Sequence, residues 1–168
     1  MTDLELDRGV GRGYRFFTGA PLLQFGHGLS LTTFSLTKTS GPANGSLVTE
    51  AAPSATLTYT VDVENTGGRT GDEVVQAYFL PVATPAQPKS RLLKQLFDYK
   101  RVHLAPGEKA TLTFAVTSET LRLADRDTGD LVSTPGAFDV LLTNGVDLNI
   151  HNAVTVRGAE VKVAAFPY

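Results

Sequence analysis

The sequence predicts an all-β chain that folds as an antiparallel β-sandwich, and two features of the sequence support this. First, apolar and polar residues alternate with a period of two, which is typical of strands buried on one face only. Over residues 56–64, for example, every apolar side chain falls on an odd position. Second, glycine, proline and asparagine recur at short intervals between these stretches, and these residues mark turns.

Three segments follow one another along the chain. Residues 1–30 predict an extended arm, because they are rich in glycine and show no strand periodicity before Leu31. Residues 31–157 carry the strand pattern and form the predicted sandwich, which leaves residues 158–168 as a C-terminal tail. A length of 168 residues suits a single domain with a sizeable core.

Within the sandwich, the alternation predicts about seven or eight antiparallel strands in two packed sheets, an immunoglobulin-like arrangement without the cysteine and tryptophan of antibody domains. Residues 40–55 and 83–95 interrupt the alternation and predict long loops, the second of them basic. The side chains expected to point inward are Tyr59, Val61, Val63, Leu112, Phe114, Val116, Phe138, Val140 and Leu142.

Composition excludes several classes of function. The absence of cysteine excludes disulfides, thiol chemistry and thiolate metal sites, and a net charge of -2 gives no general attraction to nucleic acid or anionic membranes. The N-terminus lacks the basic start and apolar run of a signal peptide, and no stretch of about 18 apolar residues could span a membrane. We therefore expect a soluble chain that binds no nucleic acid and does not insert into membranes, while its compartment stays open.

Five sequence segments carry a specific resemblance. Residues 13–21 and 24–34 of the arm combine flexible glycines with large aromatic anchors, and residues 63–78, 94–108 and 135–140 follow in the sandwich. In this order they resemble the C-terminal fibronectin type III-like domain of family 3 glycoside hydrolases, the β-glucosidase and β-xylosidase group. Two positions depart from that pattern, where Gln24 replaces an expected proline and Leu31 an expected aromatic residue.

The resemblance implies a mostly structural role. In this family the domain braces its neighbours, and in some members it reaches towards the substrate pocket or binds polymer. The family's aspartate nucleophile comes from an N-terminal barrel and its general acid usually from a following α/β domain, so this chain is expected to be non-catalytic on its own. We expect a scaffolding or docking module; the alternatives are a free-standing adaptor or structural subunit that binds a protein complex, and a carbohydrate-binding module.

The residues themselves offer little catalytic chemistry. A retaining glycosidase needs two carboxylates about 5–5.5 Å apart, whereas Asp72 and Glu73 are adjacent on a predicted strand and point to opposite faces. The acidic run at 125–130 lacks the glycine and glutamate positions of a calcium-binding EF-hand loop and predicts a tight turn instead. The three histidines lie far apart, so we assign no catalytic, cofactor-binding or metal-binding residues.

The arm and the basic loop supply the binding candidates. The docking candidates are apolar residues of the arm, expected to be buried by a protein partner or a second copy rather than by the chain's own sandwich: Tyr14, Phe16, Phe17, Leu22, Leu23 and Phe25. The basic loop candidates, which could meet an acidic partner or a glycan or simply be solvated, are Lys89, Arg91 and Lys94. A carbohydrate site would need exposed aromatics, and the strand candidates are Tyr78, Phe79, Phe97 and Tyr99, most of which are better explained as core.

Overall fold

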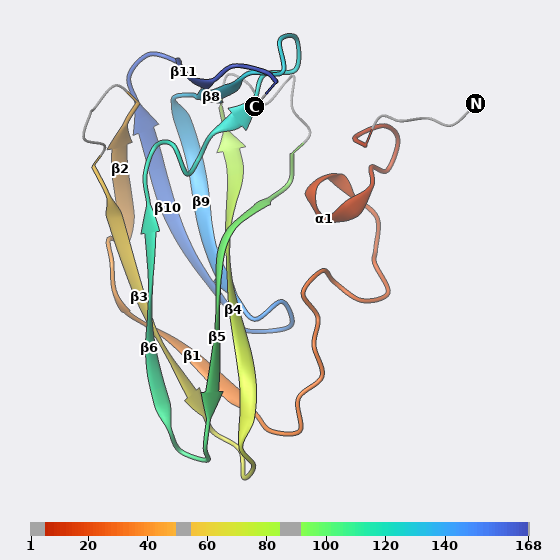
Figure 1. Ribbon diagram of the computed structural model, residues 1–168, viewed down its shortest axis with the longest axis vertical. Helices are drawn as coiled ribbons and strands as arrows, with labels where there is room; N and C mark the ends of the chain where they lie inside the picture. Colours follow the sequence, from red (N-terminus) through yellow and green to blue (C-terminus); the bar gives the residue numbers. More distant parts are fainter. Residues whose placement is uncertain (1–5, 50–54, 85–91, 168) are drawn as a thin grey trace.

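The computed structural model describes residues 6–49, 55–84 and 92–167, and it shows a β-sandwich with one short helix in the N-terminal arm (Figure 1). This confirms the predicted fold class. The elements in chain order are α1 (Gly13–Phe16), β1 (Phe34–Ser40), β2 (Asn44–Val48), β3 (Leu57–Asn65), β4 (Gly71–Ala83), β5 (Gln95–Leu104), β6 (Lys109–Val116), β7 (Leu123–Ala124), β8 (Leu131–Ser133), β9 (Gly136–Thr143), β10 (Asn149–Arg157) and β11 (Val161–Ala164).

The strands form two main sheets that face each other. One sheet has three strands in the order β1-β3-β6, and the other has five in the order β2-β10-β9-β4-β5. A third, three-stranded sheet with the order β11-β8-β7 lies across one end of the sandwich, at the top of Figure 1. The segment predicted as a C-terminal tail therefore contains a strand, β11, which pairs with β8.

The prediction of a loop over residues 40–55 is wrong in its middle, where β2 lies. This strand pairs in parallel with β10, in contrast to the antiparallel pairing expected throughout. The sequence pattern did not show it because Gly45 occupies one of the two inward positions and leaves Leu47 as the only large buried side chain. A Cβ atom at Gly45 would lie 2.4 Å from the Leu57 Cδ1 atom, so the short strand needs glycine there.

The core confirms the predicted inward face of three strands. All nine predicted residues are buried, and Tyr59, Val61, Phe114, Val116, Val140 and Leu142 are 0% exposed. Tyr59 pairs with Phe114 across β3 and β6, which fixes the register of that sheet. From the opposite sheet, Phe79 and Phe138 meet edge to face with ring centroids 6.3 Å apart, a favoured geometry for aromatic pairs.

The acidic run at 125–130 is a turn, as predicted. The Asp125 side chain accepts hydrogen bonds from the backbone N–H groups of Asp127 and Thr128, at 2.9 Å each. Asp130 joins this turn to the C-terminal residues, because its side chain accepts hydrogen bonds from the Lys162 ammonium, at 2.6 Å, and from the Phe166 backbone N–H, at 2.9 Å. Within the described ranges, no group of three or more potential metal ligands comes together.

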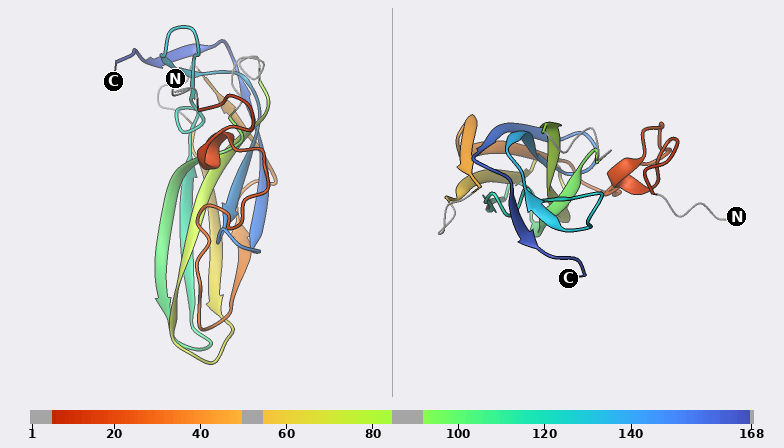
Figure 2. Two further views of the ribbon diagram at one scale, coloured as in Figure 1. Left: turned by 90° about the vertical axis from the view of Figure 1, so that its right-hand side faces the viewer. Right: turned by 90° about the horizontal axis from the view of Figure 1, so that it is seen from above.

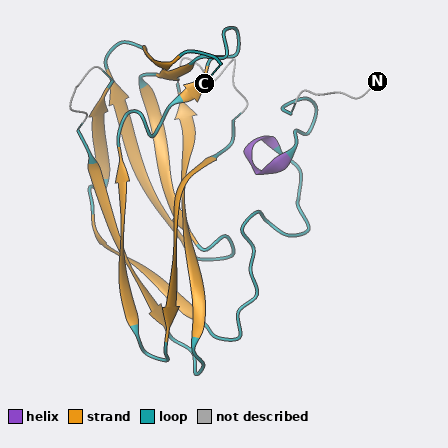
Figure 3. Cartoon of the chain, viewed as in Figure 1, coloured by secondary structure: helices purple, strands orange, loops and turns teal. Residues whose placement is uncertain are grey.

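The arm runs along the outer face of the five-stranded sheet (Figure 2). Apart from the four residues of α1, the described residues 6–33 have no regular secondary structure (Figure 3). None of the described residues form a helix long and apolar enough to cross a membrane.

Candidate docking surface

The upper part of the arm is attached to the sheet through α1. Gly13 adopts a positive φ of 64°, and the Phe17 N–H donates to the Gly13 carbonyl oxygen at 3.0 Å, which closes the single helical turn. The turn presents the Arg15 carbonyl oxygen to the Leu93 N–H, at 2.8 Å. Tyr14 also accepts a longer hydrogen bond, 3.4 Å, from the Leu96 N–H. The arm therefore continues the hydrogen bonding of the sheet near the start of β5.

Aromatic stacking adds to this attachment. The Tyr14 ring meets Tyr78 of β4 edge to face at 5.9 Å, and Phe25 stacks on Tyr14 with centroids 4.3 Å apart. The Lys94 ammonium lies 4.6 Å from the centroid of the Tyr78 ring. Tyr78 is thus covered by the arm on the outer face of a sheet, where an aromatic residue would otherwise be exposed.

This covered position changes two pKa values. Burial, with a smaller contribution from Tyr14, raises the pKa of Tyr78 to about 12, so its hydroxyl stays protonated and acts as a donor. Burial also lowers the pKa of Lys94, because the ammonium is partly removed from water. The contact between arm and sheet is therefore a desolvated interface.

A second attachment point lies further along the arm, at Gly26. The Tyr78 hydroxyl donates to Gln76 Oε1, and Gln76 Nε2 donates to the Gly26 carbonyl oxygen at 3.3 Å. Gly26 has φ +86°, and a Cβ atom there would lie 2.2 Å from Gln76 Nε2. On the other side, a Cβ atom at Gly145 would lie 2.8 Å from the Gly26 carbonyl oxygen, so both glycines are needed for the arm to approach this closely.

The six predicted docking residues divide into two groups. Tyr14, Phe16 and Phe17 are half-buried against the chain's own sandwich, and Phe16 packs against the core cluster. Leu22, Leu23 and Phe25 are exposed, by 99%, 64% and 49% respectively. The first group holds the arm in place, and the second is displayed to solvent.

Two further leucines, which are not among the docking candidates, extend the exposed group. Leu29 is 96% exposed and Leu31 is 84% exposed. Leu29 lies in the same non-periodic arm as the named candidates, and Leu31 directly follows that arm. We define the exposed leucine row as Leu22, Leu23, Leu29 and Leu31.

A largely apolar pocket of about 400 Å³ opens beside the first part of this row, since Pro21 and Gln24, the chain neighbours of Leu22 and Leu23, line it. Its apolar walls come from the arm and from the ends of β4 and β5, namely Tyr14, Phe17, Pro21, Leu80 and Leu93, and Lys94 lies at its edge. A concave apolar pocket next to exposed apolar side chains gives a partner a place to insert a side chain, as the buried anchors of protein interfaces do.

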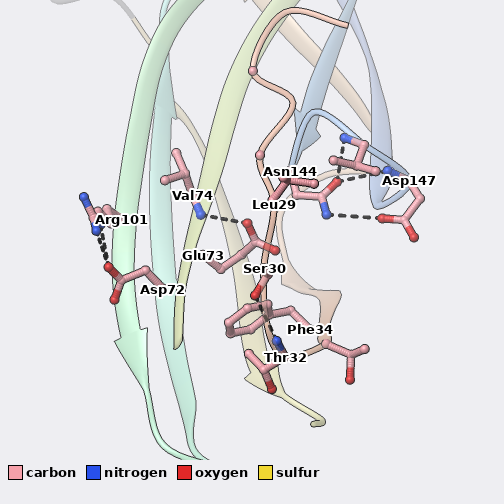
Figure 4. A pocket seen from close by; sticks show the side chains of 14 residues that line it. Leu29, Ser30, Thr32, Phe34, Asp72, Glu73, Val74, Arg101, Asn144 and Asp147 are labelled. Atoms are coloured by element: carbon pink, nitrogen blue, oxygen red, sulfur yellow. Dashed lines mark hydrogen bonds and ion pairs between the residues drawn. The ribbon is translucent and has the colours of Figure 1, made fainter. Parts of the chain in front are cut away.

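A second pocket of about 430 Å³ lies at the other end of the arm, between residues 26–34, the start of β4 and the β9–β10 turn (Figure 4). Glu73 lies on one wall and accepts a hydrogen bond from the Val74 N–H at 2.9 Å. The pKa of Glu73 is raised, chiefly by burial and to a smaller extent by the charge of Asp147. Hydrogen bonds from Val74 and Asn144 act in the opposite direction but do not cancel this rise. Asn144 binds Asp147 at 3.2 Å and caps three backbone N–H groups of its own turn.

The adjacent carboxylates of β4 diverge, as the strand pattern predicts. Asp72 faces Arg101 and His103 of β5, whose hydrogen bonds, that of Arg101 foremost, lower the pKa of Asp72. Glu73 instead faces the arm and Asn144 (Figure 4). The two side chains therefore do not form an acid and nucleophile pair.

The other binding candidates gain little from the structure. Lys89 and Arg91 lie outside the described residues, and Lys94 is engaged with Tyr78. Of the strand aromatics considered for a glycan site, Tyr78 and Phe79 are buried, Phe97 packs partly against the core, and Tyr99 is 64% exposed. A single exposed ring on β5 does not make the row that a carbohydrate-binding face needs.

Comparison with known proteins identifies relatives over nearly the whole chain. Residues 73–145 match the fibronectin type III-like domain family. A β-xylosidase from Formosa agariphila is 41% identical over 138 residues, which cover 79% of this chain and 17% of that enzyme. A probable exo-1,4-β-xylosidase from Aspergillus fumigatus is 34% identical over 182 aligned residues, which cover 99% of this chain and 23% of the relative.

Solved structures agree. A family 3 exo-β-xylosidase in complex with a xylobiose aziridine probe matches with a TM-score of 0.78 and 26% identity, over 99% of this chain and 23% of that one. The β-glucosidase from Listeria innocua in complex with gluconolactone matches with a TM-score of 0.70 and 26% identity, over 92% of this chain and 22% of that one. The chain thus spans between 17% and 23% of the length of these relatives. Its sandwich, its arm and these matches show that the chain belongs to the fibronectin type III-like domains that family 3 glycoside hydrolases carry at their C-terminus.

Proposed function

We propose that this chain is a non-catalytic docking module that binds the catalytic part of a family 3 glycoside hydrolase through the outer face of its arm. The observation that carries the proposal is the exposed leucine row, whose members are between 64% and 99% exposed. Several large apolar side chains exposed along one short segment mark a candidate interaction site.

The attachment of the arm supports this role. Tyr14 and Gly26 hold the arm against β4, so the leucines between and beyond them are displayed on an ordered segment. An ordered binding surface loses less conformational entropy on association than a free one. The neighbouring apolar pocket offers room for one inserted side chain of the partner.

The choice of partner rests on the relatives. The match to the xylosidase structure covers 99% of this chain, arm included, but only 23% of that enzyme. The larger remaining part of such an enzyme is the partner we infer for the leucine row. The hydrolytic chemistry would lie in that partner, since the carboxylates of β4 diverge.

The test uses two purified proteins, this chain and the Formosa agariphila β-xylosidase without its matching C-terminal segment. We expect weak binding that calorimetry detects at high protein concentration, and the double substitution Leu22→Asp and Leu29→Asp should weaken it at least about tenfold through the cost of burying charge. Val48→Asp is the matched control, because Val48 is also exposed, by 44%, but lies on β2 at the far edge of the sheet.

Three results would separate the alternatives. Equal binding by the double variant and the wild type would refute docking through the leucine row. A dimer of the chain in light scattering, abolished by the double substitution, would instead favour an adaptor that uses a second copy. Turnover of aryl β-xylosides or β-glucosides by the chain alone, lost on substitution of one of its carboxylates, would refute the non-catalytic assignment.

A further inference from the structure

A further pocket, of about 250 Å³, is lined by Arg15 and Phe16 of α1 and belongs to neither site described above. Its lining combines segments that are distant in sequence: the arm, the start of β5, and the strands β7 and β8 with the turn before β7. The residues are Arg15, Phe16, Leu92, Gln95, Arg122, Ala124 and Leu131. Two of them are arginines, and none is acidic.

Both arginines are held at fixed points of the backbone. The Arg15 carbonyl oxygen accepts the 2.8 Å bond from Leu93 that attaches α1 to the sheet. Arg122 lies between Leu121 and Leu123, which are 1% and 2% exposed and so are anchored in the core. The two cationic side chains therefore start from ordered positions in the lining of one pocket.

Neither guanidinium forms an ion pair with any carboxylate in the described part of the chain. Other cations do find such partners, as Lys109 does with Glu64 at 3.0 Å and Lys162 with Asp130 at 2.6 Å. A separate pocket of about 360 Å³ shares Gln95 and Arg122 with this one and is also lined by Glu119, but no ion pair joins Glu119 to Arg122. The pocket therefore has two positive charges and lacks a counter-charge from the described residues.

We propose that this pocket is a binding site for a carboxylate carried on a short hydrocarbon stem. A guanidinium is a planar fork of N–H donors that matches the two oxygens of a carboxylate. Gln95 adds an amide donor, and the apolar residues Phe16, Leu92 and Leu131 supply a surface for the stem. Phosphate suits the guanidinium forks but has no hydrocarbon part to cover that surface.

The site exists only while the arm lies on the sandwich, because one arginine comes from α1 and the other from the turn before β7. A ligand that bridges them must stabilise the docked arm, since binding to one state of an equilibrium favours that state. Occupation of this pocket would therefore further stabilise the docked position of the segment that carries the exposed leucine row.

The experiment titrates the intact, isotopically labelled chain with single-carboxylate probes and follows the Nε–Hε signals of Arg15 and Arg122 by NMR. The probes are N-acetyl-L-glutamate α-amide, which represents an acidic side chain of a polypeptide, and D-glucuronate, which represents a sugar acid. The neutral N-acetyl-L-glutamine α-amide and inorganic phosphate are the comparison ligands. Exchange of the Leu93 amide reports on the arm in the same samples.

We expect a carboxylate probe to shift both arginine signals and to slow exchange at Leu93, while the neutral amide does neither. Arg122→Gln and Arg15→Gln should each weaken binding roughly tenfold, the effect of losing one charge-assisted pair. Arg12→Gln is the matched control from the same arm and should bind as the wild type does, because Arg12 is outside the pocket lining. Tighter binding of the glutamate amide than of glucuronate assigns the carboxylate to a polypeptide, and the reverse order assigns it to a sugar acid.

Three outcomes would overturn the site. These are the absence of arginine shifts at tens of millimolar probe, equal binding of phosphate and carboxylates, and an equal loss in Arg12→Gln and Arg122→Gln. The Arg15→Gln result counts only if Leu93 exchange without ligand matches the wild type, which shows that the arm is still docked. That condition is reasonable, since the bond to Leu93 uses the backbone carbonyl of residue 15.

Discussion

Replacing Gly26 with alanine should release the arm from the sheet and leave the sandwich folded. Gly26 has φ +86°, and an alanine forced into this region costs about 1 kcal/mol. Its Cβ atom would also lie 2.2 Å from Gln76 Nε2, so the Gln76 side chain must move and lose its 3.3 Å bond to residue 26. That bond contributes about 1 kcal/mol, and the two effects together amount to roughly 2 kcal/mol.

Amide hydrogen exchange can measure this loss locally. The Leu93 N–H donates to Arg15 and the Leu96 N–H to Tyr14, so both amides report whether the arm is docked. A cost of roughly 2 kcal/mol predicts that exchange at Leu93 accelerates about thirtyfold. Amides in the middle of β3 and β6 should exchange as in the wild type, because the core does not depend on Gly26.

Gly28→Ala is the matched control for this substitution. Gly28 lies two residues further along the same arm, and a Cβ atom there has no neighbour within 4 Å. We expect a change below about 0.5 kcal/mol, as for an ordinary surface substitution. Equal exchange at Leu93 in the two variants would refute the tight contact at Gly26, and uniform loss of protection across β3 and β6 would refute separate release of the arm.

Two further predictions concern the sandwich itself. Phe114→Ala should lower the free energy of unfolding, measured in urea, by about 3–5 kcal/mol, because the ring is 0% exposed. The control Thr113→Ala, on the exposed face of β6, should change it by less than about 0.5 kcal/mol. A loss under about 1 kcal/mol at Phe114 would contradict its buried position. Glu73→Gln should stabilise the chain at pH 7 but not at pH values below 4.5. Burial raises the pKa of Glu73 above its ordinary 4.5, so the stability that its protonated form contributes is full below that value and is lost as pH rises through the folded pKa. Thermal unfolding at both pH values checks this, and the same gain at both would contradict a titrating Glu73.

The strands were predictable where large apolar residues alternate with polar ones. Tyr59 and Phe114 show this well, since each lies in a long run with period two and each proves to be fully buried. Strand β2 was not predictable, because Gly45 replaces one of its two inward side chains with a close backbone contact. The alternation also could not show that β2 pairs in parallel with β10. That pairing arises because β2 lies in the five-stranded sheet, whereas its chain neighbours β1 and β3 lie in the three-stranded one.

The candidate sites were predictable only in part. The arm could be recognised as apolar and aperiodic, but the sequence does not show which of its residues meet the sheet. That division depends on Gln76 and Tyr78, whose outward positions on β4 present a hydrogen-bonding pair to Gly26. The pocket of Arg15 and Arg122 leaves no local pattern at all, since each arginine on its own resembles a solvated surface residue.

Because part of the arm packs within the chain and part is exposed, the affinity of the proposed docking depends on the exposed part alone. The aromatic residue Tyr14 is used within the chain, where its ring covers Tyr78 and its hydroxyl accepts a bond from Leu96. The leucine row has no polar atoms to satisfy, and burying each side chain fully contributes about 1.5–3 kcal/mol, or about 6–12 kcal/mol for the row. Association of two separate molecules costs about 4–15 kcal/mol in lost freedom of motion, which offsets most of that gain. The row should therefore hold a partner firmly when a covalent linker keeps the two at millimolar effective concentration, and only weakly when the partner is a separate molecule.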